Sequence, residues 1–292
     1  GTKIAMTKKF MNTYLTTKGT PFTDIDGYKT VDFIHEFDGR DARMAQTVIS
    51  PSYQMKISGR TVPYSPNWKV TRTGYHPIKW SIDDDADNVL SKAASWNSLP
   101  IIRYAEVLLN YAEAKAELGE MDAAVWDQTI APLRNRAGVT SVIPAKADPY
   151  MEAYFLNTVT DKWILEVRRE RGIELCLEMG LRWDDDMRWG MGRLLERPWY
   201  GVYVGELGKV YDMDGDGSGD VCFVRENPPV TEPGVTYRVL GGDYALTDGD
   251  SGYIECYIRM NRKWDDKKYV RPIPTTALND NPALGQNPGW KK

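Results

Sequence analysis

The sequence is poor in the two residues that most often build metal centres and nucleophilic sites. Its 292 residues include only two histidines, His35 and His76, and three cysteines, Cys176, Cys222 and Cys256. Catalytic triads, zinc centres and haem sites rely on histidine, so these chemistries have few candidate ligands. No Cys-x-x-Cys pair occurs, and an odd number of cysteines is not a complete set of disulfides. A disulfide scaffold is therefore not expected.

Long hydrophobic runs and an excess of positive charge are also absent. No stretch approaches eighteen consecutive apolar residues, so no transmembrane helix is expected. Lys and Arg number 37 against 41 Asp and Glu, which gives a net charge of −4. Because a nucleic-acid binder normally shows a basic face, we expect no nucleic-acid partner. The hydrophobic share of 42% is enough to build a buried core.

Tryptophan and tyrosine, in contrast, are plentiful, with 10 Trp and 17 Tyr against 6 Phe. Several of them stand in the irregular stretch before the first clear helix, and from these we select four: Trp68, Tyr75, Trp80 and Trp96. Binding residues concentrate in loops, and the apolar face of a sugar ring stacks well on an indole or a phenol. We therefore predict these four as ligand-binding residues. The alternative is that their rings pack inside the loops.

The chain divides into three stretches of different pattern. Residues 1–98 are rich in Gly, Pro, Asp and Thr and predict a loop-rich segment, while residues 99–190 carry helical periodicity. Residues 191–292 mix Gly and Pro with short β-prone runs and predict a second loop-rich segment. We treat 1–292 as a single region that is mainly α, with long irregular loops and minor β.

Two helices joined by a short connection are predicted at the start of the helical stretch. The first begins near Pro100 and ends at Gly119, and the second runs from about Asp122 to the stop at Gly138. Pro132 should kink or split the second helix. Together they form a helix hairpin of tetratricopeptide type, although a single copy is weak evidence for a repeat.

The first of these helices has two kinds of surface. A polar stripe recurs at helical spacing: Glu106, Asn110, Glu113 and Glu117. Most of the remaining surface is apolar: Ile101, Tyr104, Ala105, Leu108, Tyr111 and Ala112. The pattern predicts an amphipathic helix that buries its wide apolar face.

A third helix is predicted from about Thr160 to Met179, and it carries a row of like charges. Four glutamates repeat every four residues: Glu166, Glu170, Glu174 and Glu178. Such a row is destabilising alone, but nearby arginines can neutralise it: Arg168, Arg169, Arg171, Arg182 and Arg188. We predict a structural salt network, the alternative being that one of the four is a catalytic carboxylate.

An acidic turn near residue 212 resembles the front half of a calcium loop. Its oxygen-bearing residues alternate with others: Asp212, Asp214, Asp216, Ser218 and Asp220. Asp at relative positions 1, 3 and 5 with Gly217 at 6 suits a hard cation, but position 12 is Phe223 instead of a bidentate Glu. We predict these five residues as ligands of a structural Ca²⁺, and the alternative is a solvated turn.

Motifs for organic cofactors and for common hydrolases are missing. No Walker A, His-Glu-x-x-His or G-x-S-x-G pattern occurs, and the G-x-G-x-G at Gly215 has no strand-to-helix context. We expect no organic cofactor.

Four ordered motifs resemble those of the SusD/RagB family. The stretch 99–114 (LPIIRYAEVLLNYAEA) is similar to the family's signature helix, and 133–138 (LRNRAG) to the helix that follows it. The stretch 168–190, from RRERGIEL to RWG, resembles its glutamate/arginine helix, and 269–290 resembles its C-terminal end. The likeness covers nearly the whole chain.

This resemblance implies a mainly helical fold with tetratricopeptide-like helix pairs, non-enzymatic binding of oligosaccharides, and location in the outer membrane as a surface-exposed lipoprotein. It also implies a SusC-like TonB-dependent transporter as partner in glycan uptake. The family's first helices and its lipidation cysteine have no counterpart here, so we expect the C-terminal part of the family architecture, with membrane attachment only through an anchor outside this chain.

Two other functions remain open at this point. A glycoside hydrolase would need two carboxylates at a defined separation in a cleft, and 41 acidic residues leave room for such a pair. A tetratricopeptide-type scaffold would bind a protein partner without any glycan.

Overall fold

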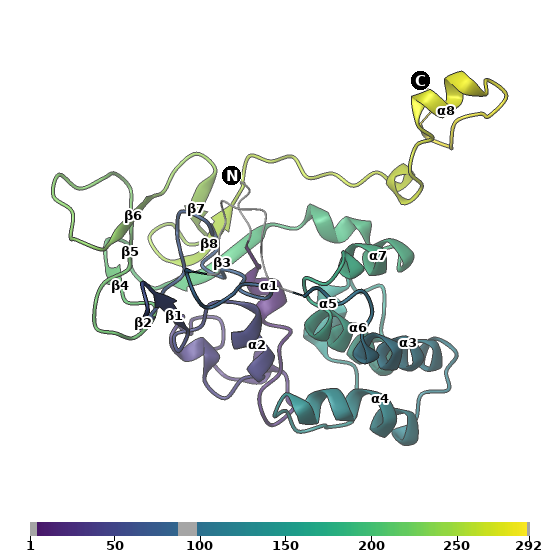
Figure 1. Ribbon diagram of the computed structural model, residues 1–292, viewed down its shortest axis with the longest axis horizontal. Coiled ribbons are helices and arrows are strands. Elements are labelled where there is room, and N and C mark those ends of the chain that lie inside the picture. The colour runs from purple at the N-terminus through teal and green to yellow at the C-terminus, as the bar shows by residue number, and fades with distance from the viewer. Residues whose placement is uncertain (1–4, 87–97, 291–292) are drawn as a thin grey trace.

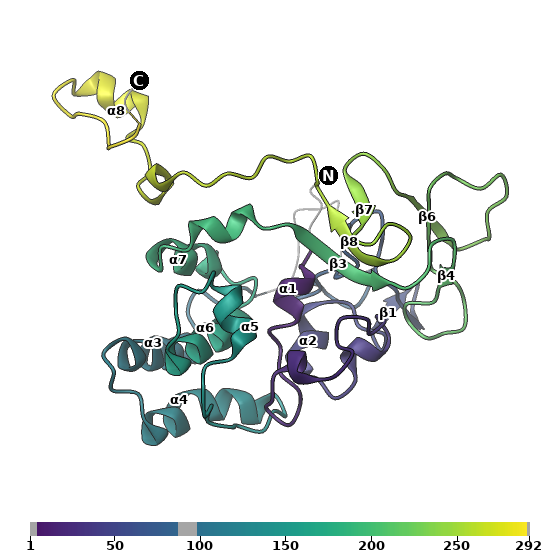
Figure 2. The same cartoon turned by 180° about the vertical axis from the view of Figure 1, so that it is seen from behind.

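The structure, a computed structural model that describes residues 5–86 and 98–290, has a helical half and a strand-bearing half (Figure 1). Helices α3 to α7 occupy one end of the molecule and the strands the other. Two short helices, α1 (Lys8–Met11) and α2 (Ala42–Thr47), lie between the halves, as the view from behind also shows (Figure 2). The architecture confirms the expected helical fold with long irregular loops and minor β.

The helical half is built on a hairpin of α3 (Tyr104–Glu117) and α4 (Ala123–Arg136). Asp122 caps α4 by accepting a 2.8 Å hydrogen bond from the amide of Val125, and Gly119 ends α3 with a φ of +70°. The predicted hairpin and its turn are therefore confirmed. Pro132 lies inside α4, but the helix continues across it and is not split.

The other helices of this half are α5 (Pro149–Tyr154), α6 (Lys162–Glu174) and α7 (Leu181–Arg188). Helix α6 packs against both α3 and α4, and the three share a core around Leu109, Trp126 and Val167. A second, small core joins α5 to α6 through Met151, Phe155 and Leu165. No helix within the described ranges is long and apolar enough to cross a membrane.

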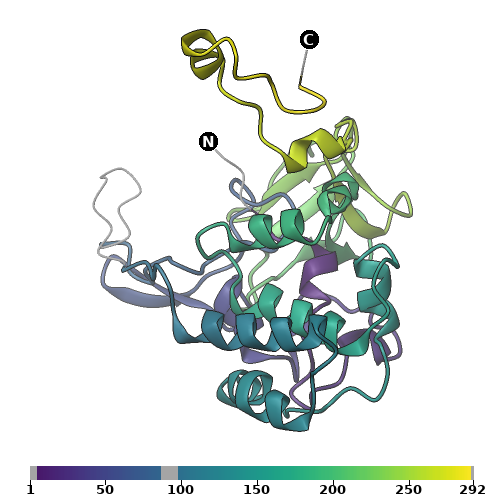
Figure 3. The ribbon, with the colours of Figure 1, turned by 90° about the vertical axis from the view of Figure 1, so that its right-hand side faces the viewer.

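The two faces of α3 differ from the prediction. The side chains that α3 buries are Ala105, Leu109, Ala112, Glu113 and Ala116. Ile101, Tyr104 and Tyr111, expected in the core, are 81%, 73% and 44% exposed. In Figure 3, turned so that the helical end faces the viewer, α3 lies at the front of the molecule. Arginines on α6 and α7 draw Glu113 inward, and this turns the larger apolar side chains outward.

The third predicted helix ends earlier than expected. Helix α6 stops at Glu174, and a turn separates it from α7. In that turn Leu177 and Met179 have φ values of +59° and +41°, and Gly180 has +79°. Left-handed residues cannot continue a right-handed helix, so Glu178 lies in the turn and not on the helix that carries the other three glutamates.

The strand-bearing half contains three small sheets. Strands β1 (Gln54–Ile57) and β2 (Arg60–Pro63) form a hairpin. The sheet order β3-β8-β7 is antiparallel and uses Trp199–Val204, Gly252–Cys256 and Tyr244–Leu246. In the third sheet, β5 (Val221–Val224) pairs antiparallel with β4 (Val210–Tyr211) and parallel with β6 (Thr236–Val239). The second and third sheets share one core with α1 and α2, and all three cysteines are buried and free.

The C-terminal segment leaves the body as an arm that carries α8 (Thr275–Asp280) at its tip (Figure 1). Trp264 anchors the base of the arm, because its ring lies 6.3 Å from that of Trp183 on α7. The tip is closed on itself by hydrogen bonds from the indole of Trp290 to the carbonyl oxygens of Lys267 and Val270, at 2.9 and 2.7 Å.

Candidate functional site

The predicted row of glutamates runs through the helical half, and its last two members, Glu174 and Glu178, line the candidate site. These residues come from α6 and the turn after it: Glu166, Glu170, Glu174 and Glu178. Arg134 of α4 binds Glu166 at 2.6 Å and Glu170 at 2.9 Å, and Arg43 of α2 binds Glu170 at 2.5 Å and Glu174 at 2.9 Å. All of these side chains are buried, so the row is a structural salt network that joins the two halves of the molecule.

The cations that neutralise the row are mostly not the predicted ones. Of the five arginines proposed from the sequence, Arg169 contacts Glu166 at 3.1 Å. The others bind different acids: Arg168 binds Glu117, Arg171 and Arg188 bind Glu113 and Asp185, and Arg182 binds Asp186. The partners of the row come from distant segments, which residue spacing within one helix does not reveal.

An open depression of about 290 Å³ lies over Glu174 and Glu178. Among the residues that line it are Lys79 and Trp80, Arg103 at the start of α3, and Arg136 at the end of α4. Arg103 and Arg136 both bind Oε1 of Glu174 at 2.6 Å. Sequence reasoning missed these two arginines, although Arg103 stands in the signature stretch and Arg136 in the motif after it.

The charges at this depression are firmly fixed. Burial alone would raise the pKa of Glu174, but hydrogen bonds from Arg136 and Arg103 and the charge of Arg43 lower it to about 2. Arg103 also binds Glu178 through Nε at 2.7 Å, and Lys79 binds Glu178 at 2.6 Å. The carboxylate of Glu174 is therefore ionised over the whole physiological range, and both oxygens of each glutamate accept hydrogen bonds from arginines.

Trp80 is the predicted aromatic residue that reaches this depression. Its ring is partly exposed, and its Nε1 donates a 2.9 Å hydrogen bond to the carbonyl oxygen of Leu177. Both residues have left-handed backbones, with φ of +77° and +59°. Such conformations cost roughly 1–3 kcal/mol each in residues other than glycine, and they persist where surrounding contacts enforce them. The indole is thus held in a fixed orientation at the rim.

Trp68 and Tyr75 lie elsewhere, and the structure corrects their prediction as ligand-binding residues. Trp68 is 2% exposed and packs edge-on against Phe223 at a centroid distance of 5.3 Å. Tyr75 is fully buried, and its hydroxyl donates a 2.7 Å hydrogen bond to Glu36. Both rings complete the core of the strand-bearing half, so neither offers a face to a ligand. Trp96 lies outside the described residues.

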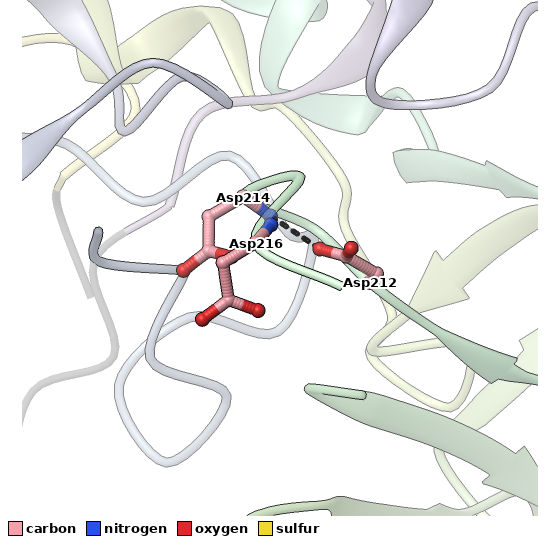
Figure 4. Close-up of side chains that lie close together, drawn as sticks. All are labelled: Asp212, Asp214 and Asp216. Atoms are coloured by element: carbon pink, nitrogen blue, oxygen red, sulfur yellow. Dashed lines mark hydrogen bonds between the residues drawn. The ribbon is translucent and has the colours of Figure 1, made fainter. Parts of the chain in front are cut away.

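The acidic turn brings three of its five predicted ligands together. The carboxylates of Asp212, Asp214 and Asp216 each place an oxygen within 4.8 Å of the others (Figure 4). Asp220 accepts a 2.7 Å hydrogen bond from the amide of Met213, while Ser218 is exposed and its amide donates to Asp216. Within the described residues this is the one cluster of acidic, histidine or cysteine side chains with metal-ligand spacing.

The electrostatics of this turn favour a cation. Partial burial and the negative charges of Asp220, Asp216 and Asp212 raise the pKa of Asp214 to about 6. A divalent cation removes that repulsion, and carboxylate oxygens are the ligands that Ca²⁺ prefers.

Comparison with known proteins decides the family. A model of the SusD family matches residues 1–290. The chain belongs to the SusD family. The four motifs are therefore parts of a SusD-family sequence, and the pairing of α3 with α4 is the expected helix hairpin.

Two solved structures share the fold of this SusD-family chain. A SusD-like protein from Bacteroides fragilis is 20% identical, with a TM-score of 0.63 over 98% of this chain and 47% of its own. A SusD-like carbohydrate binding protein from the same organism is 24% identical, with a TM-score of 0.55 over 97% of this chain and 51% of its own. The chain thus spans about half the length of either. Among curated proteins, none matches.

Proposed function

We propose that this SusD-family chain binds oligosaccharides and catalyses no reaction on them, and that the depression at Trp80 is its sugar contact. The observation that carries the proposal is the fixed, partly exposed indole of Trp80 beside a rim of hydrogen-bond donors. Sugar recognition needs both parts, an apolar ring face for the C–H groups and polar neighbours for the hydroxyls. One solved relative is described as a carbohydrate binding protein, which supports the same ligand class.

The acids at this depression support the non-enzymatic part of the proposal. A glycosidase needs one protonated carboxyl with a raised pKa and a second carboxylate about 5–9.5 Å away across the sugar. Glu174 has a lowered pKa and is bound by three arginines, so it has no proton to give. Asp214, whose pKa is raised, has its carboxylate within 4.8 Å of those of Asp212 and Asp216 on one turn, with no room for a sugar between them. Burial also raises the pKa of Asp186, but Asp186 is paired with Arg182.

Binding to a panel of oligosaccharides, followed by calorimetry on the full chain, tests the proposal. We expect Trp80→Ala to weaken the affinity for whichever glycan binds by about tenfold or more, because it removes the stacking surface. Trp199→Ala is the matched control, since Trp199 is 37% exposed on β3 and packs edge-to-face against Tyr257. Equal losses of glycan affinity in both variants, or an unchanged affinity in Trp80→Ala, would contradict the proposed sugar contact.

We further propose that the protein works at the cell surface in the outer membrane, as a lipoprotein partner of a SusC-like TonB-dependent transporter in glycan uptake. Membership in the SusD family supports this proposal. Affinity purification of the protein from membranes of its native cells should recover a TonB-dependent transporter in stoichiometric amount. Recovery of the protein from the soluble fraction with no transporter would contradict it.

We also propose a structural Ca²⁺ at the turn from Asp212 to Asp220. The convergence of three carboxylates and the raised pKa of Asp214 support it. Bound Ca²⁺ would rigidify the link between β4 and β5, with no part in sugar recognition. Calorimetric titration of chelator-treated protein with CaCl₂ tests the site.

A further inference from the structure

The depression at Trp80 exposes charge of one sign. The side chains of Arg136, Arg103 and Lys79 are 55%, 27% and 21% exposed, whereas those of Glu174 and Glu178 are 2% and 5% exposed. The acids thus lie beneath the cations that they hold in place. A ligand that enters from solvent therefore meets the positive groups first.

The free hydrogen-bonding groups of the rim are also mostly donors. Both oxygens of Glu174 accept bonds from arginines, and both oxygens of Glu178 accept bonds from Arg103. Arg136, in contrast, contacts Glu174 through Nη2 alone among the described residues. A guanidinium carries five N–H donors, so Arg136 retains donors on Nε and Nη1. The rim therefore offers donors to a ligand and few free acceptors.

The cations stand close to the stacking surface. Lys79 Nζ is 5.5 Å from the centroid of the Trp80 ring, and Arg103 and Arg136 are neighbours because they share one oxygen of Glu174. A sugar stacked on Trp80 would thus direct a ring substituent towards the cations. Arginine pairs with carboxylates in a planar, two-bond geometry, and it also binds sulfate-type oxygens well.

We infer that the depression selects acidic oligosaccharides, in which a sugar stacked on Trp80 presents an anionic group, a uronate carboxylate or a sulfate ester, to Arg136 and Lys79. This inference rests on the proposed function, since it assigns the ligand class of the same site. A neutral sugar would leave the donors of the rim bound to water and would gain stacking energy alone.

The test compares ligands that differ only in charge, by calorimetry on the full chain at low and at physiological salt. One pair is an oligogalacturonate and its methyl ester, and a second is a sulfated chondroitin oligosaccharide and its desulfated form. We expect the acidic member of at least one pair to bind about tenfold more tightly, with a preference that shrinks as salt screens the exposed rim. The pair that shows the preference identifies the anionic group.

Two variants assign the preference to the rim. Arg136→Gln should give the acidic and the neutral member of the pair similar affinities. Because the side chain of Arg136 is 55% exposed, we expect this variant to fold. Arg225→Gln is the matched control, because Arg225 is 63% exposed and also pairs with a single acid, Asp250. The control should keep the preference.

The outcomes separate this inference from the proposed function. If acidic and neutral ligands bind with equal affinity and Trp80→Ala weakens both, the inference is wrong and the proposed function still holds. A preference that survives Arg136→Gln would also overturn it. Absence of binding by every member of both pairs and of the wider glycan panel would overturn both.

Discussion

The indole nitrogen of Trp80 donates a 2.9 Å hydrogen bond to the carbonyl oxygen of Leu177, across 97 positions of sequence. This contact ties a loop before α3 to the turn that ends α6. The bond holds the indole of Trp80 against that turn, and both residues have left-handed backbones. The orientation of the proposed sugar platform thus depends on the turn between α6 and α7.

Replacing the indole by a ring without a donor tests this dependence. We expect Trp80→Phe to keep a stacking surface but lose its fixed orientation, so that sugar affinity falls by roughly threefold, less than for Trp80→Ala. Calorimetric titration of the wild type and both variants measures the order of their sugar affinities. If Trp80→Phe loses as much affinity as Trp80→Ala, the ring itself is not the platform.

Trp68 should behave as a core residue and not as a binding residue. We expect Trp68→Ala to lower the free energy of unfolding by about 3–5 kcal/mol, because it opens a cavity against Phe223. Urea denaturation measures the loss, and the folded fraction should bind sugar as the wild type does. A variant with unchanged stability and abolished binding would contradict its burial.

The fully buried members of the salt network should tolerate no missing partner. Glu170 is fully buried and forms ion pairs with Arg43 and Arg134, so Glu170→Gln removes the negative charge that both guanidinium groups share. We expect a loss of about 3–5 kcal/mol in the free energy of unfolding, measured in urea. Glu117→Gln is the control, because Glu117 is 47% exposed and contacts Arg168 at 3.4 Å, and it should cost less than about 1 kcal/mol. Similar costs would show that the network is not cooperative.

The same network should persist far into the acid range. The pKa of Glu174 is about 2 in the folded chain, below its usual value of 4.5, so folding favours the ionised form. Its contribution is therefore fully present above about pH 4.5 and disappears as the pH falls towards 2. A pH series of urea denaturation curves should show this loss for the wild type. Glu174→Gln should be less stable at neutral pH and should lack that part of the pH dependence.

Calcium should stabilise the chain through Asp214. Because the folded-state pKa of Asp214 is raised to about 6, the metal-free protein should lose stability as the pH rises from about 4 to 6, and Ca²⁺ should restore it above pH 6. Asp214→Asn should stabilise the metal-free form and weaken Ca²⁺ binding. Thermal unfolding with CaCl₂ or with EDTA measures both effects, and Asp26→Asn, an exposed acid outside the turn, is the control. A melting temperature that does not change with Ca²⁺ would contradict the proposed calcium site.

The sequence by itself determined the features that depend on neighbours along the chain. Asp122 as cap, Gly119 and Gly138 as helix ends, and the family motifs all follow from residue type and short spacing. The role of the glutamate row also followed, since four like charges at helical spacing need several cations to be stable. The proximity of Asp212, Asp214 and Asp216 was predictable because one turn contains all three.

Only the tertiary structure decided which surfaces meet. Spacing shows that side chains share a face of α3, but the arginines on α6 and α7 decide that the face with Glu113 points inward. Trp68, Tyr75 and Trp80 look alike in a loop-rich sequence, yet the sheets bury the first two and the turn at Leu177 holds the third at the surface. The contacts that fix these surfaces include bonds between residues 127, 39 and 32 positions apart, and no local pattern of residues encodes them.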